Sequence, residues 1–120
     1  MKKILVVDDD VLIRTLVKRE LEKQGFSIDV ASDGTAAWSK LERTSPDLVI
    51  TDINMPNMGG LELLKKVRGD SRYQSLPMLC ITGESSATAK QKAIALGATG
   101  WVQKPFNPDT WGETLKKILS

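Results

Sequence analysis

The sequence predicts an α/β domain in which helices cover both faces of a five-stranded parallel sheet. Short apolar runs alternate five times with longer segments whose apolar residues repeat at helical spacing. Alternation this regular indicates a doubly wound (βα)5 sheet, because parallel strands are joined by right-handed crossovers. The 120 residues contain no repeat or linker, so we expect residues 1–120 to form one domain with a core of its own.

The strands are expected where apolar runs are short and bounded by turn residues. Residues 48–52 form a continuous apolar run, which is typical of a strand covered on both faces. Residues 27–31 alternate only weakly, and Pro77 opens the fourth strand, a position where proline is tolerated. The five expected strands cover residues 3–7, 27–31, 48–52, 77–82 and 100–103.

The helices are expected where apolar residues recur among charged ones. Leu12, Leu16 and Leu21 repeat in this way in the first helix. The last helix is expected to have Asn107 as its N-cap and Pro108 in its first turn. The expected helices cover residues 11–24, 35–44, 60–69 and 86–96, and the segment from 107 to the C-terminus.

The composition excludes several classes of function. The chain has no histidine, so it has no imidazole zinc site, no Ser–His triad and no histidine from which to donate phosphate. A net charge of +2 is too small to argue for nucleic-acid binding. We expect no signal peptide and no membrane span, since no apolar stretch approaches ~20 residues. The one cysteine, Cys80, is expected to be buried, and it agrees with a cytoplasmic location.

Five residues with charged or nucleophilic side chains stand where predicted strands end. They are Asp8, Asp9, Asp52, Thr82 and Lys104. The carboxyl ends of parallel strands meet at one edge of the sheet, and ligands bind there at the switch point of strand order. Adjacent carboxylates repel one another unless a cation neutralises them, and Mg²⁺ prefers such hard oxygen ligands. This set therefore indicates a site for a divalent cation and a phosphoryl group, with Asp52 as the nucleophile.

Each of these residues also has an ordinary structural interpretation. Asp9 or Asp10 is suited to cap the helix that follows, and for Asp10 capping is the preferred interpretation. Asp52 alone is as compatible with capping as with nucleophilic attack. Lys104 alone is typical of a surface lysine, and Thr82 alone of an ordinary strand residue. The functional interpretation depends on their meeting at one edge of the sheet.

Four short motifs, in order along the chain, resemble the response-regulator receiver family of two-component signalling. The resemblance extends from Lys3 to Leu119, and four motifs at the family's spacing make it specific. The motifs are Val6-Val7-Asp8-Asp9, Asp52-Ile53-Asn54-Met55-Pro56-Asn57-Met58, Ile81-Thr82-Gly83 and Lys104-Pro105-Phe106. The resemblance implies a flavodoxin-like fold with strand order 2-1-3-4-5.

The resemblance also implies the acceptor and the metal ligands. Asp52 would accept a phosphoryl group from the phosphohistidine of a sensor histidine kinase or phosphotransfer protein. Asp9, Asp52 and the backbone carbonyl of Asn54 would bind Mg²⁺ directly, and Asp8 would act through a metal-bound water.

Further residues are implied to act on the phosphoryl group. Thr82 and Lys104 would contact its oxygens, with a cis peptide bond between Lys104 and Pro105 aiming the ammonium inward. Asn54 and Glu84, two positions beyond Asp52 and Thr82, would tune dephosphorylation by shaping the access of water.

Two residues depart from the family's usual pattern. The family couples the hydroxyl at Thr82 to an aromatic switch residue on the fifth strand, usually tyrosine or phenylalanine, where this chain has Trp101. Gly59 stands where the family often has aspartate or asparagine, and glycine there still caps a helix. Trp38 and Trp111 match no functional position, and the helical phase of Trp111 indicates a core residue.

These expectations describe a phosphorylation-controlled signalling switch that dephosphorylates itself, rather than a conventional enzyme. Its output is expected to reach a protein target through residues 86–96, strand 100–103 and the last helix, without nucleic acid or membrane. A stand-alone regulator is favoured over a receiver excised from a transcription factor or hybrid kinase. An aspartyl-nucleophile phosphatase of the haloacid-dehalogenase type fits poorly, because Leu12 stands where that class has threonine. The intact set of site residues argues against a receiver that has lost phosphorylation.

Overall fold

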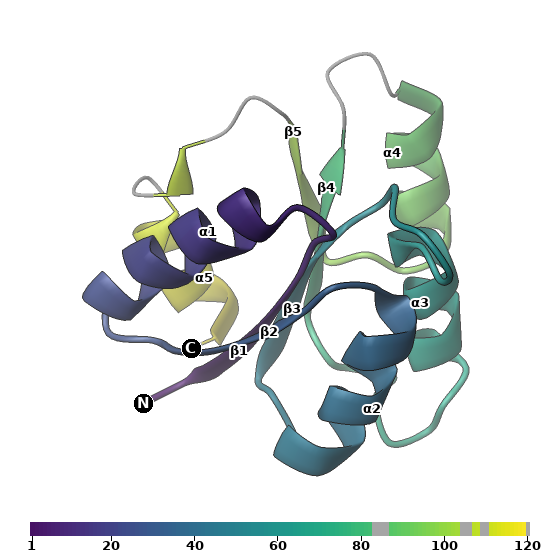
Figure 1. Ribbon diagram of the computed structural model, residues 1–120. Coiled ribbons are helices and arrows are strands. Elements are labelled where there is room, and N and C mark those ends of the chain that lie inside the picture. Colours follow the sequence, from purple (N-terminus) through teal and green to yellow (C-terminus); the bar gives the residue numbers. More distant parts are fainter. Residues whose placement is uncertain (83–86, 104–106, 109–110, 120) are drawn as a thin grey trace.

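A computed structural model describes residues 1–82, 87–103, 107–108 and 111–119 of the chain. Five parallel strands form one sheet in the order β2-β1-β3-β4-β5, which confirms the expected doubly wound arrangement (Figure 1). The strands are β1 (Lys3–Val7), β2 (Ser27–Ala31), β3 (Leu48–Asp52), β4 (Met78–Thr82) and β5 (Gly100–Gln103). The helices are α1 (Val11–Lys23), α2 (Gly34–Thr44), α3 (Gly60–Arg68), α4 (Ala87–Ala95) and α5 (Gly112–Leu119).

Helices cover both faces of the sheet, with α1 and α5 on one face and α2, α3 and α4 on the other (Figure 1). The strand β1 shows why both faces are apolar. Leu5 and Val7 belong to the core under α2, α3 and α4, whereas Ile4 and Val6 belong to the core under α1 and α5. Successive strand residues point to opposite faces, so a strand covered on both sides needs an unbroken apolar run.

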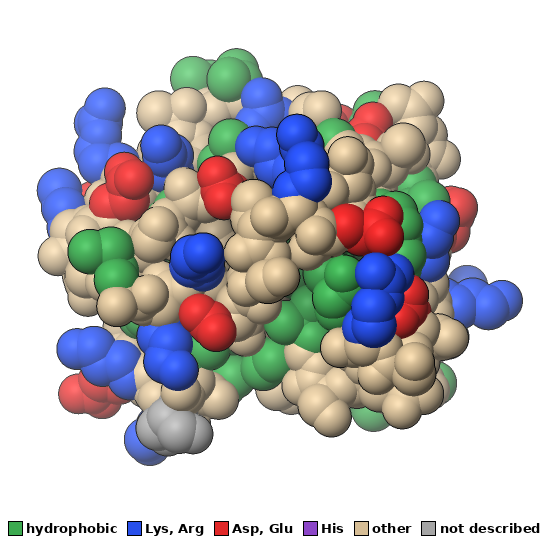
Figure 2. Space-filling view, turned by 90° about the horizontal axis from the view of Figure 1, so that it is seen from below, with side chains coloured by type: hydrophobic (Ala, Val, Ile, Leu, Met, Phe, Trp, Pro, Cys, Tyr) green, Lys and Arg blue, Asp and Glu red, His purple; other side chains and the backbone are tan. Residues whose placement is uncertain are grey.

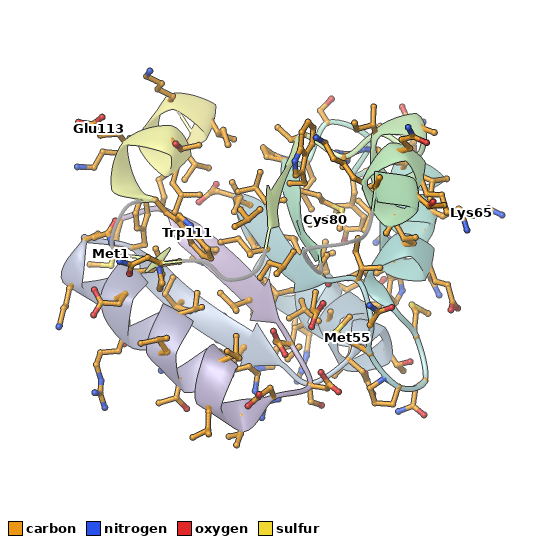
Figure 3. All side chains as sticks on the ribbon, turned by 90° about the horizontal axis from the view of Figure 1, so that it is seen from above. Met1, Met55, Lys65, Cys80, Trp111 and Glu113 are labelled. Atoms are coloured by element: carbon orange, nitrogen blue, oxygen red, sulfur yellow. The ribbon has the colours of Figure 1, made fainter. Side chains whose placement is uncertain are left out.

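Two side chains mark the two cores. Cys80 lies on the side of α3 and α4, and Trp111 lies between the sheet and α1 (Figure 3). Both are buried, as expected from the sequence. Burial raises the pKa of the Cys80 thiol to about 11, so this cysteine behaves as a small apolar side chain at neutral pH.

The strand order places a switch point at the carboxyl ends of β1 and β3. The chain leaves β1 towards β2 on one side, and later returns to place β3 on the other side. The helices α1 and α3 that follow β1 and β3 therefore cover opposite faces, which opens the sheet edge between them.

The apolar face of α1 differs from the expected one. Leu12 is 76% exposed and Leu16 is 45% exposed, whereas Val17 and Leu21 are buried and Ile13 packs against the same core. Ile13, Val17 and Leu21 recur at every fourth residue and form a continuous stripe. Leu12 and Leu16 each precede that stripe by one residue, which turns them about 100° away from it.

The last helix also begins later than expected. The described helix α5 begins at Gly112, whereas Asn107 was expected to cap it. The carbonyl of Pro108 accepts a hydrogen bond from the amide of Trp111 at 3.1 Å, three residues on. A bond to the third residue along is typical of the 3₁₀ conformation in which Pro108 lies, so Pro108 precedes α5 and does not belong to its first turn. Gly59 does serve as the N-cap of α3, as expected.

Charges of both signs are mixed on the surface. In the view from below Figure 1, Lys and Arg side chains lie among Asp and Glu side chains and apolar groups (Figure 2). The face therefore presents no large field of one sign, in agreement with the net charge of +2. The helices of the described residues are too short or too polar to span a membrane.

The phase of α1 is testable by two matched substitutions. We expect Leu21→Ala to lower the free energy of unfolding by about 2–5 kcal/mol, because it leaves a cavity in the core. Leu12→Ala, the same change on the exposed face, should alter it by less than about 0.5 kcal/mol. Urea unfolding followed by far-ultraviolet circular dichroism measures both. Equal losses for the two variants would show that Leu12 packs in the core.

Candidate functional site

Three carboxylates meet at the carboxyl edge of the sheet. Asp8 and Asp9 follow β1, and Asp52 is the last residue of β3. One carboxylate oxygen from each residue lies within 4.8 Å of those of the other two. Asp8 and Asp52 are buried, whereas Asp9 is exposed. We refer to Asp8, Asp9 and Asp52 as the acidic cluster.

The register of the sheet brings the acidic cluster together. Val7 on β1 lies opposite Thr51 on β3, so the residues that follow them emerge side by side. The amide of Asp8 donates to the carbonyl of Ala31 at 3.1 Å, which continues the hydrogen bonding between β1 and β2 beyond Val7. The backbone that carries these carboxylates is therefore held by the sheet itself, which limits the movement of the site.

Asp10 is not part of the acidic cluster, because it caps α1. Its Oδ1 accepts hydrogen bonds from the amides of Leu12 at 2.8 Å and Ile13 at 3.4 Å. This confirms the capping interpretation of Asp10. The amide of Asp10 donates to Oδ1 of Asp8 at 2.9 Å, and Nη1 of Arg14 donates to the carbonyl of Asp8 at 2.6 Å. The first turn of α1 thus fixes the position of Asp8.

The loop that follows β3 fixes Asp52. The hydroxyl of Thr51 donates to the carbonyl of Asp52 at 2.9 Å. The amide of Asn54 lies 3.4 Å from Oδ1 of Asp52. The amide of Gly60 donates to the carbonyl of Ile53 at 2.9 Å and so closes the loop. A side chain at Gly60 would overlap the carbonyl oxygen of Asp52. Glycine is therefore required here for α3 to start so close to the strand.

The acidic cluster matches the ligand preferences of Mg²⁺. Its carboxylates repel one another at this separation, and burial of Asp8 and Asp52 strengthens the repulsion because the dielectric constant is lower inside the protein than in water. A divalent cation bound by hard oxygen ligands removes that repulsion. Asp9 is exposed, so a cation here would keep contact with water, as Mg²⁺ usually does.

Part of the expected site lies outside the described residues. The residues that fall there are Glu84, Lys104 and Pro105, with the expected cis bond between the last two. Thr82 ends β4, and its neighbour Ile81 pairs with Asp52 on β3. The backbone of Thr82 therefore reaches the same sheet edge as the acidic cluster.

Trp101 lies at the surface beside α4. Its side chain is 40% exposed, and Nζ of Lys90 lies 4.0 Å from the centroid of the indole ring. An ammonium above an indole face is attracted by the electron density of the ring. Lys90 therefore favours the outward position of Trp101 in this structure.

The sequence did not reveal one contact at the edge of the site. Asp33 caps α2 through a bond from the amide of Ala36 at 2.8 Å, and its second oxygen accepts from Nδ2 of Asn57 at 2.8 Å. The Ala36 amide, and then the Asn57 side chain, lower the pKa of Asp33. An aspartate before Gly34 at a helix start is a capping signal that the sequence does offer. The contact with Asn57, 24 residues away, has no such local signal.

Comparisons with known proteins agree with this architecture. Residues 4–116 match the family model of the response regulator receiver domain. The chain is 41% identical to chemotaxis protein CheY1 of Helicobacter pylori, over 98% of this chain and 96% of that protein. It is 36% identical to response regulator Rre1 of Synechocystis, over 98% of this chain and 51% of that protein. It resembles the structure of chemotaxis response regulator CheY4 of Vibrio cholerae with a TM-score of 0.91 and 44% identity, over 99% of both chains.

The family match extends over nearly the whole chain, and the sheet has the strand order that the resemblance implied. Rre1 and CheY4 are named as response regulators, which, with the family model, supports a role in phosphorylation-controlled signalling. On these grounds the chain belongs to the response regulator receiver domain family.

Proposed function

We propose that this chain is a signalling switch that accepts a phosphoryl group on Asp52. The observation that carries the proposal is the acidic cluster, in which Asp52 is a buried carboxylate beside Asp8 and Asp9. A carboxylate accepts a phosphoryl group only when the negative charges are neutralised, and the other two carboxylates can hold the cation that does so. Asp52 is the only one of the three that belongs to a strand, because it is the last residue of β3, whereas Asp8 and Asp9 follow β1.

The transfer step follows from this arrangement. A carboxylate oxygen of Asp52 would attack the phosphorus of a phosphohistidine on the kinase, so that the O–P bond forms while the P–N bond breaks. Bound Mg²⁺ would supply the positive charge that stabilises the phosphoryl oxygens. Asp9, Asp52 and the carbonyl of Asn54 would hold it directly, and Asp8 through a water.

Two further residues would bind the transferred group. Thr82 and Lys104 would donate hydrogen bonds to phosphoryl oxygens, a role that the family resemblance implies for both. Asn54 and Glu84 would orient the water that later hydrolyses the acyl phosphate, so that the chain resets itself. The position of Asn54 in the loop beside Asp52 supports its part in this proposal.

The partners are proposed by class. The phosphate donor would be a histidine kinase or phosphotransfer protein, and the target a protein that contacts α4, β5 and α5. The chemotaxis relative is matched over 96% of its length, whereas Rre1 is matched over 51%. We propose a stand-alone cytoplasmic regulator by likeness to the chemotaxis relative; a receiver excised from a longer protein would match both relatives to the same extent.

Phosphorylation by acetyl phosphate in the presence of Mg²⁺ tests the acceptor. We expect mass spectrometry to locate the acyl phosphate on Asp52, and Asp52→Asn to abolish it. Asp9→Ala should slow the reaction about tenfold or more, because a metal ligand is lost. Asp47→Ala is the control, since this acid accepts a bond from the amide of Lys3 at the opposite edge of the sheet and should leave the rate close to that of the wild type. Modification that persists in Asp52→Asn would refute the assignment.

We propose that Trp101 reports and transmits the phosphorylated state. A hydrogen bond from Thr82 to a phosphoryl oxygen would be charge-assisted and about twice as strong as a neutral one, so the hydroxyl should move towards Asp52. That movement leaves space for the indole to turn inward. Turning inward breaks the contact with Lys90, which is worth about 0.5–1 kcal/mol at an exposed site. Burying part of the indole favours the inward position, whereas the lost contact with Lys90 and an indole N–H that then needs an acceptor oppose it, so we expect a shift of population rather than a complete change.

Fluorescence of Trp101 tests the switch in a Trp38→Phe, Trp111→Phe background. The ring centroids of Trp38 and Tyr73 lie 5.8 Å apart in a T-shaped arrangement, and Trp111 is buried. Phenylalanine preserves an aromatic ring at each of these two tryptophan positions. Beryllofluoride with Mg²⁺ should shift the emission to shorter wavelength, because the indole leaves water. The same chain with Asp52→Asn should show no shift. Unchanged emission, with binding of the mimic confirmed by ¹⁹F NMR, would make Trp101 a static residue.

A further inference from the structure

The loop between β3 and α3 borders the acidic cluster at one end and touches another part of the chain at its other end. Figure 1 shows this loop descending beside the start of α2. Nδ2 of Asn57 donates to Oδ2 of Asp33 at 2.8 Å, and the amide of Gly34 donates to the carbonyl of Met58 at 2.8 Å. We refer to these two hydrogen bonds as the strap.

Both sides of the strap are shaped for this contact. A Cβ atom at Gly34 would lie 2.7 Å from the carbonyl oxygen of Met58, so only glycine lets the two segments approach. Asn57 has a φ of 65°, in the left-handed region that asparagine adopts more readily than most residues. Asp33 is already oriented, because its other oxygen caps α2 through the amide of Ala36. The partners are therefore ordered by their own segments, which lowers the entropy lost in joining them.

The loop is short enough that a displacement at the strap would also displace the backbone beside the site. Asn57 lies three residues after Asn54, and the loop closes at the hydrogen bond from Gly60 to Ile53. At its inner end, the amide of Asn54 lies 3.4 Å from Oδ1 of Asp52, which is long for a hydrogen bond. A small movement of the loop would break this contact and would move the carbonyl of Asn54 with it.

We propose that Asp33 and Asn57 are positioning residues for the acceptor site. Their hydrogen bond sets the position of the backbone at Asn54, and through it the affinity of the acidic cluster for Mg²⁺. This inference rests on the function proposed for Asp52. Neither side chain belongs to the acidic cluster, so both act through the loop. The turn between β2 and α2 thereby influences chemistry at the end of β3.

Calorimetric titration of the unphosphorylated chain with Mg²⁺ tests the strap. Asn57→Gly removes the amide and keeps a residue that tolerates the left-handed backbone. We expect Mg²⁺ affinity to fall about three- to tenfold. This is less than the full effect of losing a hydrogen bond to a charged group, because only part of the loss reaches the metal site through the loop. Asn57→Asp places a second carboxylate against Asp33 and should lower the affinity further. The exchanged pair D33N/N57D restores a bond with donor and acceptor reversed, and should recover most of the affinity.

A control variant separates positioning from a general loss of stability. Oδ2 of Asp47 accepts a bond from the amide of Lys3 at 2.8 Å, at the opposite edge of the sheet. Asp47→Ala removes this contact and should leave Mg²⁺ affinity unchanged. Unfolding by urea in EDTA, measured for every variant, shows how far each change destabilises the chain. A loss of Mg²⁺ affinity in a variant that unfolding in EDTA shows to be fully folded is a result that a purely structural role would not produce.

The outcomes distinguish the strap from the function on which it rests. Wild-type Mg²⁺ affinity in Asn57→Gly, or a loss in Asn57→Asp that D33N/N57D does not recover, would overturn the inference while Asp52 remains the acceptor. A wild-type chain that binds no Mg²⁺ and takes no phosphate from acetyl phosphate would overturn the proposed function, and the strap's role with it.

Discussion

Repulsion among Asp8, Asp9 and Asp52 is the constraint on which the rest of the structure depends. Oxygens of the three carboxylates lie within 4.8 Å of one another, and such a group opposes folding unless its surroundings hold it or a cation neutralises it. Adjacent parallel strands hold it, because β1 and β3 end within one residue of each other and are covered on both faces. Asp10 and Gly60 complete the arrangement, one by ordering the turn around Asp8 and the other by letting α3 start beside Asp52. A cation or phosphoryl group then acts on an arrangement that the core has already fixed.

The sheet could be predicted from the sequence, and the helix surfaces only in part. A strand covered on both faces is an unbroken apolar run, and β3 gives that signal without ambiguity. The first helix carries two overlapping apolar stripes, and only the tertiary packing decides that Ile13 and Val17 face the core while Leu12 and Leu16 do not. The start of α5 lies after the residue that the sequence predicts, because Pro108 is in the 3₁₀ conformation that is frequent at the ends of α-helices.

The site was predictable to the extent that its residues stand at the ends of strands. The three acids converge because strand ends converge, and Asp10 caps α1 because it directly precedes the helix. The hydrogen bond between Asp33 and Asn57 depends on the path of a loop, which no local pattern specifies. The roles of Thr82, Glu84 and Lys104 stay predictions, since the first is described only in its backbone and the other two lie outside the described residues.

The fold holds the acidic cluster together against the repulsion of its carboxylates, and a bound cation should relieve that repulsion. The free energy of unfolding, measured by urea for the wild type and for Asp52→Asn in EDTA and over a Mg²⁺ titration, tests this most directly. The wild type should gain about 1.4 kcal/mol for each tenfold rise in Mg²⁺ above its dissociation constant. Asp52→Asn should be the more stable chain in EDTA and should gain less from Mg²⁺. A wild type whose stability ignores Mg²⁺, together with an Asp52→Asn chain that is less stable in EDTA, would contradict the claim.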